Sequence, residues 1–461
     1  MIIRRKYPAI NATESNQSQR RVDSTSSESE DDDADSAVEV LSMPGVSVLR
    51  PLKGIDVALA ENLRSSFLQE YDGPMEIIFS VADKEDPAVE VVEDLLQEFP
   101  NADAKLVIGD LPTTPNPKVN NLQIPYSQAR HNIIWILDSN VHVLPQTLQS
   151  SVHLLFENPQ NGLVHHLPIT QTPTTPGSLL EHTFLNIAHA KMYSVINHFS
   201  IAPCIIGKSN LFRKSDVDRV EGGFAGLGRT MSEDNALGLA ILSLGLKHAI
   251  GKEYVRQSLG DMSLEAFFGR RARWIRVRAH TVLAPTLLEP FSEALLSGLT
   301  FAWALSGLAG VEMWKTLVAH FVYWAWCDWN MARTFDPEFV EGNGRAFVFA
   351  WLARELTTFA LWVVAVSGNT VDWRGTKYVL SRNRPPRPVG VSTPAVPSQQ
   401  PRSPPSSATT SKKSSAKSRR SSARHASAPP EVPSRLPKNP PTPTIRKHSR
   451  SICRRKSQIL N

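Results

Sequence analysis

Cysteine is scarce in this chain of 461 residues, which contains three, Cys204, Cys327 and Cys453, far apart from one another. Cysteines so few and so scattered exclude a disulfide framework and a cysteine-based zinc site. The composition as a whole also excludes a collagen and a coiled coil. The length therefore leaves room for one large folded domain with membrane or disordered additions.

Acidic residues are nearly missing from the C-terminal segment 382–461, which holds 18 Lys and Arg but a single acid, Glu431, for a net charge of +17. The remaining residues hold 32 bases and 43 acids, so their net charge is −11. The overall charge of +6 is therefore positive only because of the tail, and we expect no nucleic-acid partner. Pro and Ser dominate this segment, which predicts a disordered basic tail. The tail is either a solvated arm or an electrostatic contact with anionic lipid, which phosphorylation of Ser421 or Ser422 would weaken.

Aromatic residues are almost absent from the N-terminal segment 1–43, which has no long apolar run and carries the acidic run SESEDDDADS. Such a segment buries too little apolar surface to offset its chain entropy, so we predict that it is disordered. It has neither the apolar core of a signal peptide nor a run of 18 apolar residues, and we expect no membrane insertion here.

Apolar runs and helical patterns alternate between residues 44 and 284. The predicted strands are 46–49 (VSVL), 76–81 (EIIFSV), 104–108 (AKLVI) and 133–137 (IIWIL). Residues 89–99 have the apolar spacing of a helix. This succession predicts an α/β domain with a parallel sheet, whose ligands bind at the carboxyl ends of the strands.

Three apolar stretches follow, at 294–311, 316–327 and 346–366. We interpret residues 285–381 as membrane-associated or transmembrane helices, with two or three crossings, because eight of the ten tryptophans lie in or beside them, as at membrane interfaces. Buried helices of a soluble domain are the alternative. Arg354 and Glu355 interrupt the last stretch, so we expect them to face protein or an aqueous cavity.

Three carboxylates stand where this fold places ligands. Asp83 and Asp138 follow the second and fourth predicted strands, and Asp234 precedes a predicted helix at 236–250. A nucleotide-sugar site needs an acceptor such as Asp83, an oxygen ligand for a cation such as Asp138, and a base such as Asp234. Each also has a structural explanation, as turn chemistry or as the first turn of a helix capped by Ser232.

About 36 residues after Asp234 comes the run 270–274, RRARW. It resembles the (Q/R)xxRW element of family 2-like glycosyltransferases, which have the signature D, D, D, (Q/R)xxRW. Arg273 could neutralise the phosphate of a leaving group, and Trp274 could stack on the acceptor.

The resemblance narrows over residues 44–381 to the ceramide glucosyltransferases, a family 21 of glycosyltransferases. The similar runs include PGVSVLRPLKGID, NPKVNNL, IIWILDSNVHVLPQTL, SEDNALGLAI, LAPTLLEPFSEALL and VDWRGTKYVL. The resemblance implies a GT-A nucleotide-sugar-binding domain at 44–284. It also implies inverting transfer of glucose from UDP-glucose to the primary hydroxyl of ceramide, on the cytosolic face of Golgi or ER membranes.

The resemblance also implies residue roles. Asp83, Lys118 and Asn121 would bind the nucleotide sugar, Asp138 would bind it together with Mg²⁺ or Mn²⁺, and Asp234 would be the general base. The terminal motif would be Arg270, Arg273 and Trp274. His189 matches a family histidine tied to acceptor or inhibitor binding, and Cys204 matches a family cysteine near the active site, although a lone His or Cys is more often merely packed.

The chain departs from the family pattern in three places. The family has an N-terminal membrane helix, whereas here an acidic segment stands in its place; either that helix is missing from this sequence or the C-terminal helices alone dock the protein. Asn140 replaces a glycine after Asp138, which adds an oxygen ligand or crowds the sugar. Lys208 replaces an apolar residue expected near the acceptor path. A processive polysaccharide synthase and an inactive membrane scaffold therefore remain as alternatives.

Overall fold

The computed structural model describes residues 43–199, 203–373, 375–382 and 384–389. The predictions of disorder for residues 1–42 and 390–461 lie outside these ranges, as does Cys453.

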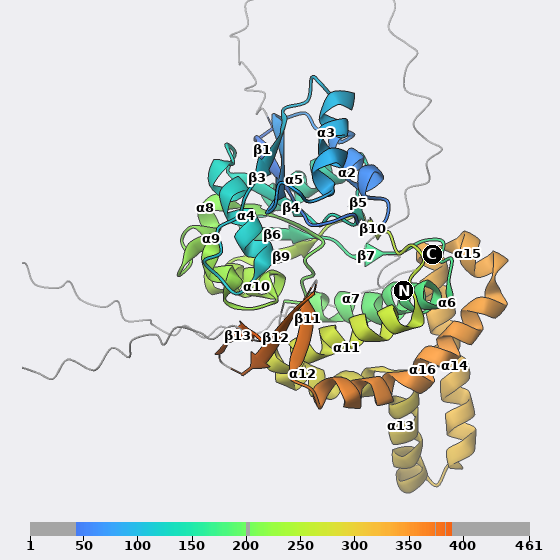
Figure 1. Ribbon diagram of the computed structural model, residues 1–461. Helices are drawn as coiled ribbons and strands as arrows, with labels where there is room; N and C mark the ends of the chain where they lie inside the picture. The colour runs from blue at the N-terminus through green and yellow to red at the C-terminus, as the bar shows by residue number, and fades with distance from the viewer. Residues whose placement is uncertain (1–42, 200–202, 374, 383, 390–461) are drawn as a thin grey trace, which may run out of the picture. The chain divides into compact units, whose positions relative to one another are not determined.

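A seven-stranded sheet organises the N-terminal half of the described chain (Figure 1). Its strands, in spatial order, are β3 (Ala104–Ile108), β2 (Met75–Val81), β1 (Val46–Leu52), β4 (Ile133–Leu137), β8 (Ser209–Arg213), β6 (Asn161–His165) and β9 (Lys247–Ile250). The first four are parallel, as predicted, but β8 runs antiparallel to both β4 and β6, so the sheet is mixed. The one reversed strand places the start of β8 beside the carboxyl end of β4.

Both faces of this sheet are covered, because alternate strand residues point to opposite sides. Trp135 and Phe79 pack on one side with α2 (Leu59–Phe67), α3 (Ala88–Glu98) and α5 (Thr147–Glu157). Ile134 and Ile78 pack on the other with α4 (Pro117–Gln128), α8 (Lys214–Val217), α9 (Gly223–Gly226), the 3₁₀ turn η2 (Leu227–Arg229) and α10 (Glu233–Ser243). The α/β fold class is confirmed, and its three layers explain why these strands are apolar throughout.

Two short sheets complete the β structure. One has the order β5 (Val141–His142), β10 (Val255–Gln257) and β7 (Pro168–Ile169). The other consists of β11 (Thr370–Trp373), β12 (Thr376–Ser381) and β13 (Arg384–Pro388). This second sheet differs from the sequence-based expectation, since residues 370–381 were assigned to membrane helices and residues 384–388 to the disordered tail. Strands β11 and β13 each pair with β12, which places both segments in this sheet.

The predicted helix 236–250 is wrong at both ends. Helix α10 begins earlier, at Glu233, and ends at Ser243, after which Gly245 adopts a positive φ of 76°. Residues 247–250 then form β9, which pairs with β6. The glycine permits the reversal, because a left-handed backbone suits glycine better than other residues.

Helices dominate the rest of the described chain (Figure 1). They are α6 (Pro176–Thr183), the π-helix η1 (Phe184–His189), α7 (Ala190–Phe199), α11 (Leu264–Thr281), α12 (Leu283–Leu288), the 3₁₀ turn η3 (Glu289–Ser292), α13 (Ala294–Ala309), α14 (Met313–Phe335), α15 (Pro337–Gly342) and α16 (Gly344–Val366). The predicted apolar stretches correspond to α13, α14 and α16. Arg354 and Glu355 on α16 are buried among protein groups, as predicted, and Arg354 pairs with both Glu293 and Glu355.

Of the helices in the described ranges, α16 is long and apolar enough to cross a membrane. The pair formed by residues 283–292 and 294–309 would supply a second span if it counts as one despite its bend of 76°. Helix α14 does not reach the same apolarity, although several of its side chains, such as Trp314 and Trp326, are 61% exposed.

Candidate active site

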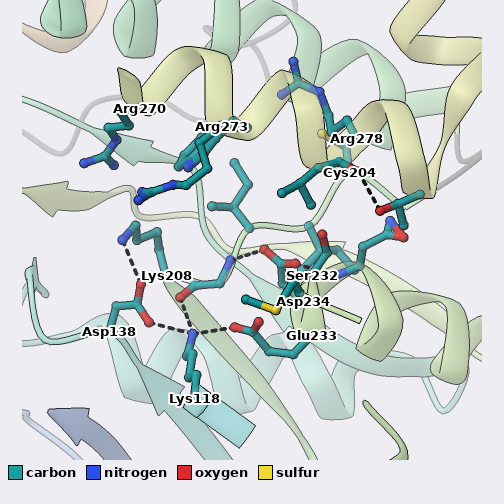
Figure 2. Close-up of a pocket in the computed structure, with 18 of the residues that line it drawn as sticks. Lys118, Asp138, Cys204, Lys208, Ser232, Glu233, Asp234, Arg270, Arg273 and Arg278 are labelled. Atoms are coloured by element: carbon teal, nitrogen blue, oxygen red, sulfur yellow. Dashed lines mark hydrogen bonds and ion pairs between the residues drawn. The ribbon is translucent and has the colours of Figure 1, made fainter. Parts of the chain in front are cut away.

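All ten predicted site residues line one cavity of about 1290 Å³. Figure 2 labels six of them: Lys118, Asp138, Cys204, Asp234, Arg270 and Arg273. It extends from the carboxyl edge of the large sheet to helices α7, α11 and α12. The ten residues are Asp83, Lys118, Asn121, Asp138, His189, Cys204, Asp234, Arg270, Arg273 and Trp274. The fold thus brings together residues spread over almost 200 positions of the sequence, while their individual roles stay predictions.

Asp138 lies in an ion-pair cluster set up by the reversed strand. Leu137 of β4 stands opposite Ser209 of β8, so the next pair outward is Asp138 and Lys208. The Asp138 backbone N–H donates to the Lys208 carbonyl at 3.1 Å, and the two side chains meet on the same side, with Lys208 Nζ 2.7 Å from Asp138 Oδ2. Opposite residues of an antiparallel pair point to the same face, which accounts for this contact.

Lys118 reaches the same carboxylate from helix α4. Asn116 caps that helix, since its side chain accepts hydrogen bonds from the backbone N–H groups of Lys118 and Val119. The cap fixes Lys118 in the first turn, with Nζ 2.6 Å from Asp138 Oδ1 and 2.8 Å from Glu233 Oε1. Asn116 also donates to Glu233, so the starts of α4 and α10 are joined. Figure 2 shows Lys118 between Asp138 and Glu233.

These contacts determine the charges in the cluster. Burial alone would raise the pKa of Asp138, but the Lys118 and Lys208 ammonium groups hold it well below its usual range. Burial opposes the charge of Lys118, yet Asp138 and Glu233 raise its pKa. Burial lowers the pKa of Lys208, and Asp138 only partly offsets this. Asp138 is therefore ionised throughout the physiological pH range.

Asp234, in the first turn of α10, has a different environment. Its Oδ2 accepts the Gly207 N–H and its Oδ1 the Asn235 N–H, each at 2.7 Å. Burial and the neighbouring Glu233 nevertheless raise the pKa of Asp234 to about 7, against the opposing effects of Lys118 and these two hydrogen bonds. Ser232 stands at the N-cap position but its side chain makes no capping bond, so that expectation is wrong.

Gly207 permits the close approach of these groups. A Cβ at this position would lie 3.0 Å from Lys118 Nζ, 3.1 Å from Glu233 Oε1 and 3.4 Å from Asp234 Oδ2. A side chain here would push apart the lysine and the carboxylates.

The predicted nucleotide-binding residues differ in their roles within the fold. Asp83 is exposed in the turn after β2, where Oδ1 accepts the Glu85 N–H at 3.1 Å. Asn121 is buried, and its side-chain NH₂ donates to the carbonyls of Leu52 and Ser80 at 3.2 Å each. Asn121 therefore ties together the carboxyl ends of β1 and β2, while Asp83 remains accessible from the cavity.

The RRARW residues lie on α11, along one wall of the cavity. Arg270 and Arg271 both pair with the buried Glu181 at 3.1 Å. Their guanidinium groups also lie over the Trp274 ring, 5.2 and 4.3 Å from its centroid. Trp274 thus already stacks on two arginines. Figure 2 shows Arg273 directed toward the cavity, on the side where Lys208 lies.

His189 and Cys204, the two further predicted site residues, also line the cavity. His189 is buried in the π-helix η1, and neither ring nitrogen has a hydrogen-bond partner among the described residues. Burial, with the nearby Arg271, Arg278 and Arg270, lowers the pKa of His189 to about 3, so its ring is neutral. Burial raises the pKa of the Cys204 thiol to about 12, so it is no nucleophile.

The residues around Asp138 do not fit the divalent cation predicted there. Both Asp138 oxygens are within 2.7 Å of a lysine Nζ, and no cluster of three or more His, Cys, Asp or Glu in the described ranges could hold a metal ion. Mg²⁺ at a nucleotide site is held through one or two carboxylates together with substrate phosphates and water, so it needs at least one free carboxylate oxygen, and Asp138 offers none. Two ammonium groups at the same carboxylate would also repel it.

Sequence reasoning missed two participants. Glu233, the neighbour of Asp234, has no role in the sequence-based prediction, yet it anchors Lys118. Lys208 was expected near the acceptor path, but it instead contacts Asp138 and Asn140. Lys208 reaches Asp138 because β8 runs antiparallel to β4. The apolar pattern of a strand in the sequence does not show in which direction that strand runs in the sheet.

Comparison with known proteins shows the family of the chain. The model of the family "Glycosyl transferase family 21" matches residues 12–385. The chain belongs to this family of glycosyltransferases. It is 33% identical to a "Ceramide glucosyltransferase" of Komagataella phaffii, over 72% of this chain and 82% of that protein, and 31% identical to "Ceramide glucosyltransferase 1" of Caenorhabditis elegans, over 74% and 72%.

A solved structure, that of a Pyrobaculum calidifontis mannosyltransferase with GDP-Man and Mn²⁺, is 19% identical with a TM-score of 0.41 over 70% of this chain and 86% of that one. A similarity this low supports no conclusion, so the assignment of the fold class depends on the observed strand order of the sheet.

Proposed function

We propose that this glycosyltransferase transfers glucose from UDP-glucose to the primary hydroxyl of ceramide, with inversion at the anomeric carbon. The product would be glucosylceramide, a sphingolipid. Its relatives named ceramide glucosyltransferases, each matched over more than two thirds of its length, support the assignment.

The observation that carries the proposal is a single cavity with two chemically different ends. At the sheet edge it is lined by charged groups, among them Lys118, Asp138 and Lys208. Toward α7, α10 and α12 it is lined by apolar groups, of which Val195, Leu239 and Leu288 are 49%, 49% and 67% exposed. A charged sugar nucleotide fits the first end and a lipid acceptor the second.

The chemistry between the two ends would be a single displacement. Asp234, ionised above a pKa of about 7, would take the proton of the ceramide hydroxyl as its oxygen attacks the anomeric carbon. The bond from that carbon to the diphosphate oxygen would break with inversion, and UDP would leave. Lys118, Lys208 and Arg273 would offset the charge that develops on the diphosphate.

His189 would contact the acceptor. Its two ring nitrogens are buried, lack partners among the described side chains and belong to a residue that lines the cavity. A neutral imidazole can donate one hydrogen bond and accept another, which suits the hydroxyl and amide groups of ceramide. Cys204, whose pKa is raised by burial, would pack against the lipid rather than react.

We also infer attachment to Golgi or ER membranes, with the catalytic domain facing the cytosol. Helix α16 and the bent pair at residues 283–309 are the candidate spans. The basic tail, of which residues 390–461 lie outside the described ranges, would then contact anionic lipid at the membrane surface.

The test is an assay of the purified full chain in detergent with UDP-glucose and a short-chain ceramide. We expect one product, with the mass of glucosylceramide and a β-glycosidic bond by NMR, and weaker use of UDP-galactose and GDP-mannose. A polymeric product would instead indicate a processive synthase. UDP-glucose binding without any glucosyl lipid would indicate a scaffold.

A further inference from the structure

Two oxygen-bearing side chains of the turn after β4 converge on one ammonium group. Lys208 Nζ lies 2.7 Å from Asp138 Oδ2 and 2.9 Å from Asn140 Oδ1. The two oxygens come from the same Asp-Ser-Asn turn, whereas the lysine comes from the residue before β8. The turn therefore acts as a small cradle of oxygen atoms with Lys208 in it.

A divalent cation would need the same two oxygens. The other Asp138 oxygen is paired with Lys118 at 2.6 Å, so the carboxylate has no side free of an ammonium group. A metal ion bound in this turn would either displace the Lys208 ammonium group into a buried region or remain close to its positive charge. Both are costly where water is scarce.

We propose that Lys208 is the built-in cation of the donor site, so that this enzyme binds the UDP diphosphate and transfers glucose without a divalent metal ion. The inference rests on the proposed function, because it takes UDP-glucose as the donor. Lys208 thereby takes the role first predicted for Mg²⁺ or Mn²⁺ at Asp138.

The geometry of Lys208 suits this role. An ammonium group has three N–H donors, and Asp138 and Asn140 account for two, which leaves one for a diphosphate oxygen. The side chain is only 10% exposed, and its backbone is held by the β4–β8 register, so little freedom is lost when the nucleotide binds. Figure 2 shows Lys208 Nζ facing the region toward which Arg273 also points.

The charges nearby support an anionic ligand. The two lysines are balanced by Asp138 and Glu233, and Arg270 is balanced by Glu181. Arg273 lies over Trp373, 5.5 Å from the ring centroid, and adds a further positive charge. Lys208 and Arg273 thus offer a diphosphate two cationic contacts in the same part of the cavity.

The first experiment measures UDP binding to the full chain by calorimetry, once in EDTA and once with Mn²⁺. We expect the two dissociation constants to agree within about twofold, since the site holds no oxygen set for the metal. UDP binding that occurs only with Mn²⁺ would overturn the inference while leaving the proposed function intact. No UDP binding under either condition would refute both.

The second experiment replaces the lysine. Lys208→Met frees the Asp138 and Asn140 oxygens, so UDP binding in EDTA should weaken by about tenfold or more, and Mn²⁺ should restore at least part of it. Lys208→Arg keeps the charge and should stay independent of metal. Lys214→Met is the matched control, because Lys214 pairs with Asp218 away from the cavity and should not change UDP binding.

Glucosyl transfer supplies an independent measurement. The wild-type chain should keep its turnover in EDTA, and the Lys208→Met variant should gain a requirement for Mn²⁺. Wild-type turnover that EDTA abolishes and Mn²⁺ restores contradicts the inference. If Lys208→Met does not fold, the wild-type chain and Lys208→Arg still test the inference. Turnover of the wild-type chain that depends on a metal ion overturns it without any variant.

Discussion

In two charged clusters of this protein the charges pair with one another, yet the clusters differ in their access to a cavity. In the first, Arg354 on α16 pairs with Glu293 and Glu355, and all three side chains are at most 10% exposed. In the second, Lys118, Lys208, Asp138 and Glu233 pair with one another at the edge of the sheet, but they line a cavity of about 1290 Å³.

The difference separates a structural cluster from a functional one. A buried charge needs partners in either case, since desolvation is costly. Around Arg354 the partners come from neighbouring helices and the cluster is closed. Around Asp138 the same rule is satisfied, yet Lys208 retains a donor and the adjacent Asp234 keeps a pKa of about 7. Ion pairing alone thus identifies no active site; the cavity beside it does.

The largest effect is expected for Asp234→Asn, which removes the proposed base but keeps the shape of the side chain. Turnover should fall by about 10² to 10⁴-fold, because general base catalysis contributes that much. UDP affinity should stay near that of the wild type. The measurement is a steady-state assay with UDP-glucose and short-chain ceramide, alongside calorimetry with UDP. Asp218→Asn, remote from the cavity, is the control, and near-normal turnover of Asp234→Asn would remove it from the mechanism.

Next in size is Arg354→Met, which breaks the closed cluster. Removing one partner of a buried pair costs about 3 to 5 kcal/mol, so the thermal unfolding midpoint in detergent should fall clearly. Turnover per folded molecule should not change. Arg333→Met is the control, because the exposed pair with Glu341 contributes at most about 1 kcal/mol. An unchanged midpoint for Arg354→Met would contradict a structural role of this cluster.

The dependence on pH distinguishes Asp138 from Asp234. Only the ionised form of Asp234 accepts a proton, so kcat/KM should rise about tenfold per pH unit below its pKa of about 7 and level off above it. Asp138, ionised throughout, should add no step. A flat profile between pH 5.5 and 8 would contradict the assignment of Asp234.

The same raised pKa has an opposite effect on stability. The folded protein binds the Asp234 proton more tightly than the unfolded chain, so this group lowers stability as pH rises from the ordinary Asp value to about 7. Asp234→Asn should remove that slope. The check is the unfolding midpoint of both proteins between pH 5 and 8, and identical slopes would contradict it.

The smallest effect is expected for His189→Ala. Loss of one or two neutral hydrogen bonds to the acceptor should raise KM for ceramide by about 2- to 10-fold, with UDP affinity unchanged. His198→Ala is the control, since His198 is exposed on α7. A change in UDP affinity instead would place His189 on the donor side.

Much of this architecture is predictable from the sequence, because the first four strands are short apolar runs and each is followed by polar residues at a strand end. The positions of Asp83 and Asp138 follow from that pattern. The helix at 233–243 was predicted too far toward the C-terminus, since the apolar pattern continues from α10 into β9 and Gly245 alone marks the break.

The partner of Asp138 was not predictable from the sequence. Lys208 stands 70 positions away, and only the antiparallel pairing of β8 with β4 brings it to the carboxylate. Strand direction depends on tertiary packing rather than on local residue preferences. The same holds for Trp274, whose arginine neighbours result from the helical spacing of RRARW around the buried Glu181.

The central claim is tested most directly by lipid mass spectrometry of a cell line that lacks glucosylceramide. Expression of the wild-type chain should restore glucosylceramide, and expression of Asp234→Asn at the same level should not. Absence of glucosylceramide with the wild-type chain, in spite of normal expression, or its equal restoration by Asp234→Asn, would contradict the account.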